Sequence, residues 1–426
     1  MSVLFNNFKT KDLTTRENIM WNAFGSLVFL GCQWLITVFA ARLSNGYSDA
    51  GVLAICMSIA NIYAQVGLFK IRSYQVSDLT CEYSASEYIC FRLISMAMGL
   101  AFVLLYAVFT CSLSTAFSVF LYCFYKSFEV FIDVLHGIDQ KSRRMDLCGI
   151  SMFVRGVLSL AAFTLGFAFL KSLNASFLLM ILVNVPILLL DWYRAFSVCN
   201  AGAFHFAISA SRWRNLFVEC LPSAIGVVCC SAVTTVSRQL LDYMSGSEIL
   251  GIYASVCTPA VIVQAGASFV YAPLLGDYAA YLHNGDFKKI RKSFVVSVAC
   301  FMFITGVSLV FSYLFGDWFL RTVFGSSISG YTDLLYLALV SAVSTALIGY
   351  LTDLSIVFRN MRASLICNLI PLLIVGPLTI WFVSLCGPNG VSIAIIISFI
   401  IGSIALCISL ANTIKRFTRN STTTGK

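Results

Sequence analysis

Long apolar stretches, separated by short polar connections, make up most of this chain. Twelve stretches are apolar over 18 residues or more, and they are continuous rather than alternating with a period of two. This pattern predicts membrane-spanning helices and argues against β-barrel strands. The expected fold class is an all-α polytopic membrane protein with 12 transmembrane helices. The predicted spans are 18–42, 49–69, 88–110, 113–138, 146–170, 173–193, 214–241, 248–275, 293–316, 331–357, 363–386 and 390–414.

The composition agrees with this class and excludes several others. Of the 426 residues, 59% are hydrophobic and only 11% are charged, whereas a soluble domain carries about 25% charged residues. Residues 1–17 are polar, so we expect no cleavable signal peptide before the first span. The 16 cysteines include no Cys-x-x-Cys pair, which argues against a zinc site or a disulfide framework. We expect no metal and no cofactor.

The basic residues indicate the orientation in the membrane. The N-terminus, alternate connections and the C-terminal tail hold 22 of the 28 lysines and arginines, including Lys70, Arg72 and Arg92, which we assign to the connection after span two. Three lie within spans, and only Arg42, Lys171 and Arg321 fall on the opposite side. Under the positive-inside rule both termini are cytoplasmic and the number of spans is even. The net charge of +9 therefore reflects topology, and we expect no nucleic-acid partner.

Twelve spans divide naturally into two lobes of six. We predict a cytoplasmic N-terminal segment (1–17), an N-lobe (18–193), a cytoplasmic inter-lobe loop (194–213), a C-lobe (214–414) and a cytoplasmic tail (415–426). Gly51-Val-Leu-Ala at the start of the second span is echoed by Gly251-Ile-Tyr-Ala at the start of the eighth. With an even number of spans in each half, such a repeat would be parallel, about an axis along the membrane normal. The alternative is that both glycines serve close helix packing.

Several spans collect their polar residues on one face. Polar groups inside a membrane normally face a bundle interior or a water-filled cavity, so these stripes predict a polar central cavity between the two pseudo-symmetric lobes. The predicted cavity residues are Asn22, Gln33 and Thr37 in span one, Lys126, Glu129 and Asp133 in span four, and Glu219, Thr234 and Arg238 in span seven. For Arg238, an interfacial pair with Asp242 is the alternative.

Depth singles out two cations. Lys126 lies about 20 Å into span four at 1.5 Å per residue, near the midplane, and Arg155 reaches a similar depth in span five. Glu129 is one turn from Lys126 and pairs with one of them, so one positive charge is left over. An anionic substrate would supply its counter-charge. The alternative is a structural network in which Glu129 or Asp133 neutralises both cations.

No enzyme motif accompanies these residues. The sequence contains no phosphate loop, no dinucleotide-binding glycine motif and no His-Glu-x-x-His, so we expect a protein that is not an enzyme. Transport would then be driven by an ion gradient or by consumption of the product. Glu129 and Asp133 are the candidates for ion coupling, with purely neutralising salt bridges as the alternative.

Four segments of the N-terminal half resemble a known family. Residues 18–25 (NIMWNAFG), 67–78 (GLFKIRSYQVSD), 133–140 (DVLHGIDQ) and 144–156 (RMDLCGISMFVRG) are similar to bacterial Wzx-like polysaccharide transporters. These are lipid-linked oligosaccharide flippases of the MOP superfamily, which also holds MATE multidrug exporters and the lipid II flippase. The second half of the chain carries no comparable motif.

The resemblance implies a function in the bacterial plasma membrane. The cargo would be an undecaprenyl-pyrophosphate-linked oligosaccharide, moved to the outer leaflet for polysaccharide biosynthesis, with Lys126, Arg155 and Arg238 as receptors for its anionic headgroup. Membrane lipids and polysaccharide polymerase or assembly proteins are the other expected partners. Arg72, Asp78 and Arg144 lie in a basic rim at the predicted inner mouth and are candidates for a cytoplasmic gate. The alternative is that the positive-inside rule alone places basic residues there. The alternatives are a MATE-type ion-coupled antiporter and a non-transporting scaffold of a polysaccharide assembly complex.

Overall fold

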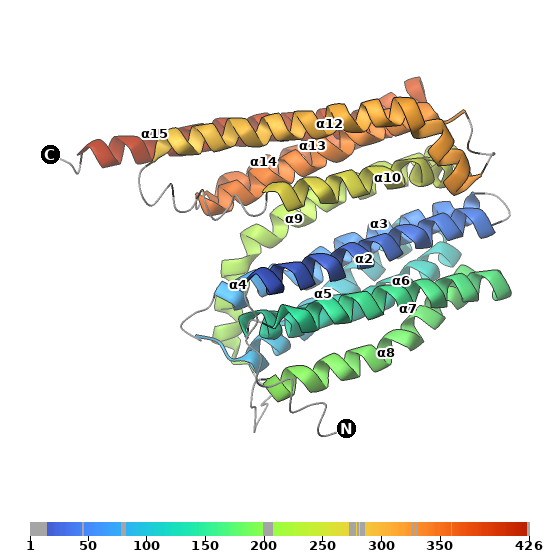
Figure 1. The fold of residues 1–426 in the computed structure, drawn as a ribbon, viewed down its shortest axis with the longest axis horizontal. Helices are drawn as coiled ribbons and strands as arrows, with labels where there is room; N and C mark the ends of the chain where they lie inside the picture. Colours follow the sequence, from blue (N-terminus) through green and yellow to red (C-terminus); the bar gives the residue numbers. More distant parts are fainter. Residues whose placement is uncertain are drawn as a thin grey trace. The chain divides into compact units, whose positions relative to one another are not determined.

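The computed structural model of the chain describes residues 15–44, 47–77, 82–142, 144–198, 208–271, 278, 281, 286–325, 328, 330–358 and 360–423. All long regular elements within these ranges are α-helices (Figure 1). The all-α polytopic fold class is thereby confirmed.

The helices follow one another through short connections. In chain order they are α2 (Thr15–Leu43), α3 (Ser48–Leu68), α4 (Ile71–Ser77), α5 (Ala85–Thr110), α6 (Leu113–Lys141), α7 (Met145–Leu170), α8 (Leu173–Val198), α9 (Ala210–Ser245), α10 (Ser247–Tyr271), α12 (Phe287–Phe324), α13 (Thr332–Val357), α14 (Met361–Cys386) and α15 (Asn389–Thr423).

Each predicted span corresponds to one of these long helices. Eleven described helices are long and apolar enough to cross a membrane. The remaining long helix is α6, whose 29 residues would also span a bilayer but include Lys126, Glu129 and Asp133. Helix α6 is therefore less apolar than the other long helices, because it carries three charged residues near its middle.

Local sequence signals explain where several helices begin and end. Ser84 and Glu87 form a reciprocal capping box that starts α5, so this helix begins before the apolar run that predicted it. At the other membrane face, Lys171 adopts a left-handed conformation (φ 49°) that ends α7 and lets α8 start two residues later.

The chain divides into two compact units. Unit 1 comprises Met1–Ser44 and Ile55–Ala224, and unit 2 comprises Asn45–Ala54 and Ile225–Lys426. Two helices therefore contribute to both units: the first turns of α3 belong to unit 2, and the first third of α9 belongs to unit 1. The boundary between the two units in α9, between Ala224 and Ile225, lies C-terminal to the predicted inter-lobe loop 194–213.

The same helix pairings recur in the two units. In unit 1, α6 packs on α5 and α8, and α7 packs on α8; in unit 2, α13 packs on α12 and α15, and α14 packs on α15. Each pairing in unit 2 uses the helices six spans later in the chain. This correspondence is what a parallel internal repeat produces.

Close packing of α2 against α7 fixes the frame of unit 1. A Cβ atom on Gly25 would lie 2.4 Å from the carbonyl oxygen of Gly149, and a Cβ atom on Gly149 would lie 2.3 Å from that of Trp21. Because no side chain fits there, the two backbones approach directly, as small residues allow in membrane helices. This approach sets the position of Arg155, two turns further along α7.

Candidate functional site

A polar stripe on α6 carries the predicted cation–carboxylate pair. Nζ of Lys126 lies 2.7 Å from Oε2 of Glu129, and the two side chains are 15% and 29% exposed. Beside them, the hydroxyl of Tyr125 accepts a 2.9 Å hydrogen bond from Nε2 of Gln33 on α2. Lys126 and Glu129 thus neutralise each other at a partly accessible position in unit 1.

Arg155 on α7 is buried without a carboxylate partner. Its side chain is almost wholly enclosed at 4% exposure, and its guanidinium carbon lies 4.7 Å from the centroid of the Phe29 ring. Within the described part of the chain, its Nε and Nη1 atoms have no hydrogen-bond partner. A buried guanidinium normally has its N–H groups satisfied, so two donors without a partner make Arg155 a candidate binding group.

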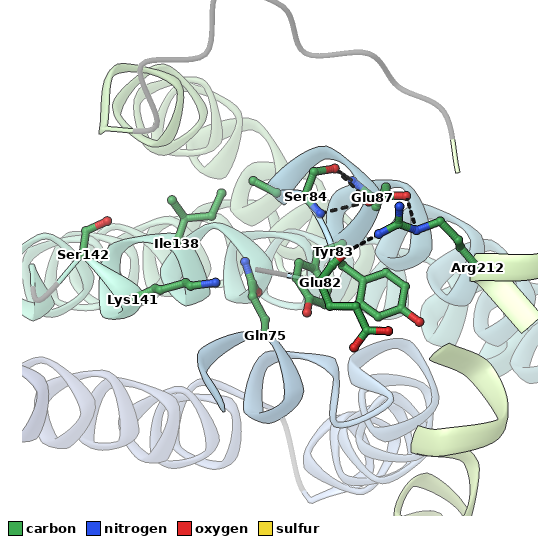
Figure 2. A pocket seen from close by; sticks show the side chains of 11 residues that line it. Gln75, Glu82, Tyr83, Ser84, Glu87, Ile138, Lys141, Ser142 and Arg212 are labelled. Carbon is green, nitrogen blue, oxygen red and sulfur yellow. Dashed lines mark hydrogen bonds and ion pairs between the residues drawn. The ribbon is translucent and has the colours of Figure 1, made fainter. Parts of the chain in front are cut away.

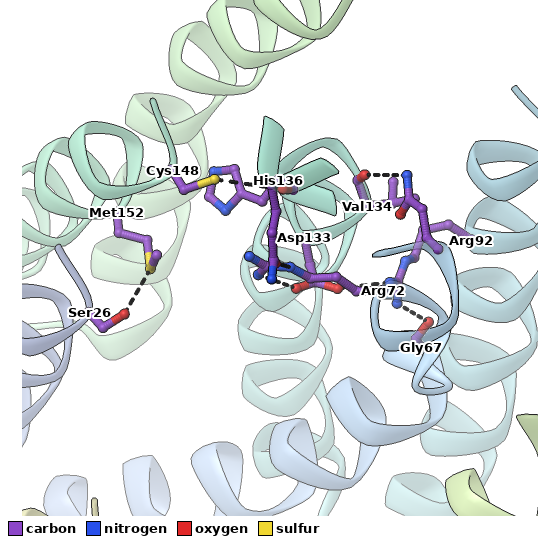
Figure 3. Close-up of polar contacts among 11 residues, drawn as sticks. Ser26, Gly67, Arg72, Arg92, Asp133, Val134, His136, Cys148 and Met152 are labelled. Atoms are coloured by element: carbon purple, nitrogen blue, oxygen red, sulfur yellow. Dashed lines mark hydrogen bonds and ion pairs between the residues drawn. The ribbon is translucent and has the colours of Figure 1, made fainter. Parts of the chain in front are cut away.

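Asp133, the third charged residue of the stripe, bridges two arginines. Its Oδ1 lies 3.1 Å from Nη1 of Arg72, and its Oδ2 lies 2.8 Å from Nη2 of Arg92 (Figure 3). Arg92 also donates a 2.7 Å hydrogen bond to the Gly67 carbonyl, one of the last carbonyls of α3. Asp133 therefore links α4, α5 and α6. It pairs with Arg72 and Arg92, and not with Lys126 or Arg155.

The burial of Arg92 was missed in the sequence. The pattern of basic residues predicts Arg92 in a connection, whereas the structure places it inside α5 with 0% exposure. The capping box of Ser84 and Glu87 was the available signal, because it starts the helix two turns before Arg92. Ser95, one turn further on, donates a 2.8 Å hydrogen bond to the same Gly67 carbonyl.

The predicted gate residues are held in ion pairs of unit 1. Arg72 pairs with Asp133, and its Nε also donates a 3.1 Å hydrogen bond to Oε1 of Gln140. Arg144 forms a two-point pair with Asp146, at 3.0 and 2.9 Å, and is largely buried. Asp78 lies outside the described residues, so the predicted neighbourhood of Arg72 and Asp78 has no structural counterpart here.

Glu219 meets the short helix α4. Its Oε2 accepts a 2.5 Å hydrogen bond from the hydroxyl of Tyr74. Burial and the neighbouring carboxylate raise the pKa of the Tyr74 phenol, which therefore stays protonated and acts as the donor. Both residues belong to unit 1, so this bond holds the first third of α9 in that unit.

The structure describes the other predicted cavity residues within their own units. Thr234 and Thr37 hydrogen-bond backbone carbonyls of their own helices, those of Ser231 and Trp34. Asn22 on α2 and Arg238 on α9 are half-buried. The structure therefore brings together Gln33, Lys126 and Glu129 with their neighbours in unit 1, while Thr234 and Arg238 belong to unit 2.

Unit 2 has a polar centre that the sequence did not indicate. Asn368 on α14 is fully buried, and its amide nitrogen donates a 3.0 Å hydrogen bond to Oγ1 of Thr352 on α13. Its amide oxygen accepts from the thiol of Cys230 on α9 at 3.1 Å. These three groups are neutral, and they join three helices of unit 2.

Unit 1 also contains a pocket of about 500 Å³ at its predicted cytoplasmic end (Figure 2). The pocket lies between α4, the starts of α5 and α9, and the end of α6. Nε of Arg212 lies 2.9 Å from Oε1 of Glu87, and the guanidinium covers the Tyr83 ring at 4.9 Å. Its lining residues include Gln75, Glu82, Ser84, Lys141 and Ser142.

Comparison with known proteins decides what this arrangement is similar to. The chain is 27% identical over 301 residues to the capsular polysaccharide biosynthesis protein CapF of Staphylococcus aureus, covering 69% of this chain and 73% of that protein. No protein-family model matches the sequence. Its fold matches an inward-facing MATE multidrug resistance transporter of the MOP superfamily with a TM-score of 0.70 at 12% identity, covering 92% of this chain and 95% of the transporter.

A second solved structure extends this result. The lipid II flippase MurJ in an inward closed conformation matches with a TM-score of 0.69 at 12% identity, covering 95% of this chain and 90% of MurJ. The resemblance to Wzx-like flippases of the MOP superfamily is confirmed. A fold similar to these two transporters, together with eleven described helices that are apolar and long enough to span a bilayer, makes this chain a multi-pass membrane protein.

Proposed function

We propose that this protein is a flippase that moves a lipid-pyrophosphate-linked oligosaccharide from the cytoplasmic to the outer leaflet of a bacterial plasma membrane. The similarity to a capsular polysaccharide biosynthesis protein supports the polysaccharide pathway, and the MATE and MurJ folds support a transporter that works by alternating access. The cargo enters a cationic cavity between two lobes, and polysaccharide polymerase and assembly proteins receive it outside.

One observation carries this proposal: Arg155 is a buried cation with unsatisfied N–H groups. A planar guanidinium binds phosphate oxygens through two parallel charge-assisted hydrogen bonds, which a lysine cannot reproduce. Stacking on Phe29 fixes the plane of the guanidinium, so little side-chain freedom is lost on binding. A pyrophosphate that reaches Arg155 would satisfy donors that the described protein groups leave open.

Lys126 and Glu129 give the same region a second, responsive charge. Their pair is partly exposed, so an anionic headgroup can compete with Glu129 for Lys126. Protonation of Glu129 would release Lys126 to the headgroup, which makes Glu129 the better coupling candidate. Asp133 is the weaker one, because its two carboxylate oxygens already pair with Arg72 and Arg92. Arg238 remains a proposed headgroup contact of unit 2.

The gate at the cytoplasmic mouth rests on Arg72 more than on Arg144. Arg72 retains a quarter of its side-chain exposure and shares Asp133 with Arg92, so it can exchange partners without leaving a buried carboxylate alone. Arg144 is enclosed in a two-point pair with Asp146, a geometry that suits a fixed anchor for the start of α7.

The first test concerns Arg155 and transport. Arg155→Lys should lower export of surface polysaccharide at least tenfold, because a charge-assisted bidentate contact is worth about 1.5–3 kcal/mol. Arg155→Gln should abolish export and leave lipid-linked oligosaccharide in the inner leaflet. Arg321→Gln is the matched control, since Arg321 is exposed and pairs with Asp317. Insertion of each variant is checked by membrane fractionation, and export at the unmodified rate by Arg155→Gln would reject the proposal.

A second candidate, a MATE-type ion-coupled drug antiporter, is favoured by the equally high fold similarity to a MATE transporter. The same variants separate the two functions. An antiporter would extrude cationic dyes from cells, and Arg155→Gln would leave extrusion unchanged or improve it, because a cation does not need a buried arginine. A non-transporting scaffold would support polysaccharide export in every variant that inserts.

The proposed orientation has its own test. Lys171 and Lys289 are both exposed at helix ends, and the bias of basic residues places them on opposite sides of the membrane. In a variant without other reactive cysteines, a membrane-impermeant maleimide applied outside should label Lys171→Cys and spare Lys289→Cys. Labelling in the reverse pattern would place both termini outside.

A further inference from the structure

The pocket shown in Figure 2 contains none of the residues assigned above to cargo, ion coupling or the gate. Its volume of about 500 Å³ lies within the range of about 300–1,000 Å³ that is typical of small-molecule sites. Its walls come from α4, the residues that lead into α5, the end of α6 and the start of α9, and all of these belong to unit 1. The pocket is therefore complete within one unit.

The pocket holds charges of both signs. Its cations are Lys141 and Arg212, and its carboxylates are Glu82 and Glu87, so the formal charges of the four side chains cancel. In the view of Figure 2, Lys141 and Arg212 approach from opposite sides, with Glu82 between them. A polyanion such as a pyrophosphate would meet two carboxylates here, and a simple cation would meet two basic groups. The ligand that matches this pocket carries one charge of each sign.

Protein groups hold Arg212 in position. Its Nε lies 2.9 Å from Oε1 of Glu87, and its Nη2 donates a hydrogen bond to the Glu82 carbonyl. The guanidinium lies over the Tyr83 ring at 4.9 Å, and the arginine side chain is still 44% exposed. Nη1 is therefore the guanidinium nitrogen that remains, among the described contacts, for an oxygen of a bound phosphate. Such a charge-assisted hydrogen bond forms at little cost, because the arginine is already ordered.

The other two charges of the site are exposed. Lys141 lies in the last turn of α6, and Glu82 precedes α5. The ammonium of Lys141 can bind a phosphate together with Arg212. The carboxylate of Glu82 can accept hydrogen bonds from an ammonium group of the ligand, whereas the carboxylate of Glu87 is already bound to Arg212.

The pocket lies at the end of a helix with an exposed apolar face. Glu87 shares a stripe of α5 with Ile94 and Met98, seven and eleven residues later, whose side chains are 39% and 48% exposed. Large apolar side chains exposed on a spanning helix are covered by acyl chains. Tyr83 and Tyr88, which line the pocket, are aromatic residues of the kind that gathers at the level of lipid headgroups. A lipid whose chains run along α5 would bring its headgroup to this pocket.

We propose that this pocket binds the headgroup of a zwitterionic phospholipid that carries a primary ammonium, such as phosphatidylethanolamine. The phosphate binds Arg212 and Lys141, and the ammonium binds Glu82. The bound lipid thereby links the end of α6 to the start of α9 and to the residues that lead into α5. This site is separate from the cargo site, and it does not depend on what the protein transports.

Headgroup selectivity tests the assignment. The purified full-length protein in detergent is mixed with equal amounts of short-chain phosphatidylethanolamine and phosphatidylglycerol, and native mass spectrometry counts each bound lipid. The protein should prefer phosphatidylethanolamine about fivefold, which is the strength of one partly exposed ionic contact. Glu82→Gln removes the partner of the ammonium and leaves the pocket positive, so the preference should vanish or reverse. Equal binding of both lipids by the unmodified protein, or an unchanged preference in Glu82→Gln, would reject the proposal.

Two further variants separate the pocket from general lipid contacts. Lys141→Gln should weaken the binding of both lipids about threefold, because both carry a phosphate. Arg321→Gln is the control, since Arg321 forms an exposed pair with Asp317 on α12, and it should keep the preference and the strength of binding. Losses of the same size in the two variants would show that the lipids do not use the pocket. Lys141 and Glu82 are exposed, so the two pocket variants are expected to fold.

The source of the ligand is tested with a soluble compound. O-Phosphoethanolamine has the same charged groups without acyl chains and should compete only weakly with the lipid. Competition at equal concentration would assign the pocket to a soluble metabolite and reject the lipid.

A photoreactive phosphatidylethanolamine tests the location without any variant. With its diazirine next to the headgroup, it should label residues 82–88 and 138–142 in preference to the start of α12. Equal labelling of these segments would overturn the proposal. None of these measurements involves export, so they can fail while the proposed function holds, and they can succeed if it does not.

Discussion

The two units of this protein build their polar centres from different chemistry. In unit 1, the buried guanidinium of Arg92 and the carboxylate of Asp133 form an ion pair 2.8 Å long, and a second arginine shares the carboxylate. In unit 2, Asn368, Thr352 and Cys230 join three helices through neutral hydrogen bonds. The ion pairs that the structure describes in unit 2, such as that of Lys289 and Asp286, lie at exposed positions.

The polar centre of unit 1 is therefore charged, and the polar centre of unit 2 is neutral. Charges inside a membrane are expensive and are kept where a substrate or an ion uses them, whereas neutral amides and hydroxyls act as general contacts between helices. Unit 1 contains the pair of Lys126 and Glu129 and the buried Arg155 besides the ion pairs of Asp133, while the cluster of Asn368, Thr352 and Cys230 in unit 2 is neutral. This contrast supports the proposal that the anionic headgroup binds in unit 1.

The largest expected effect comes from breaking the ionic centre. Asp133→Asn should lower the free energy of unfolding by about 3–5 kcal/mol, because it leaves the fully buried Arg92 without a counter-charge. Thermal unfolding of the purified protein in detergent measures the loss. Asp286→Asn removes an exposed partner of Lys289 and should leave the unfolding temperature unchanged. Equal behaviour of the two variants would remove the distinction between the units.

A smaller effect is expected in the neutral centre. Asn368→Leu should cost about 1–2 kcal/mol, since single hydrogen bonds between membrane helices contribute about 0.6 kcal/mol each and this residue makes several. The same unfolding measurement applies, with Ser384→Ala on the exposed face of α14 as the control. A loss as large as that of Asp133→Asn would show that unit 2 depends on its polar centre as strongly as unit 1.

The smallest effect is expected where α9 meets unit 1. Tyr74→Phe should cost about 0.5–1.5 kcal/mol, because it removes the hydrogen bond to Glu219. The pKa of Tyr74 is raised in the folded protein, so this contribution is complete below the usual phenol pKa of about 10 and is lost only as the pH rises above it. Unfolding curves at pH 6 and pH 8 should therefore show the same difference, and a difference that vanishes at pH 8 would contradict the assigned donor.

Patterns along the chain predicted the helices well and the charged contacts less well. Each of the twelve apolar stretches became one long helix, since a spanning segment must satisfy its backbone hydrogen bonds within itself. The pair of Lys126 and Glu129 also followed from their spacing, as side chains three residues apart share a helix face. Arg92 was misplaced because a positive-inside count assigns a cation to a connection without knowing where a capped helix begins.

By itself, the sequence determined the membrane class, the number of long helices and the stripe of charges on α6, because these depend on local hydropathy and on the period of one helix. Only the tertiary structure decided which charge belongs to which partner: Asp133 was taken by Arg72 and Arg92, and Arg155 was left with open donors over Phe29. It also decided that the backbones of α3 and α10 approach each other closely at Gly51 and Gly251. Such contacts depend on how separate helices cross, and a sequence read along one helix at a time carries no information about that crossing.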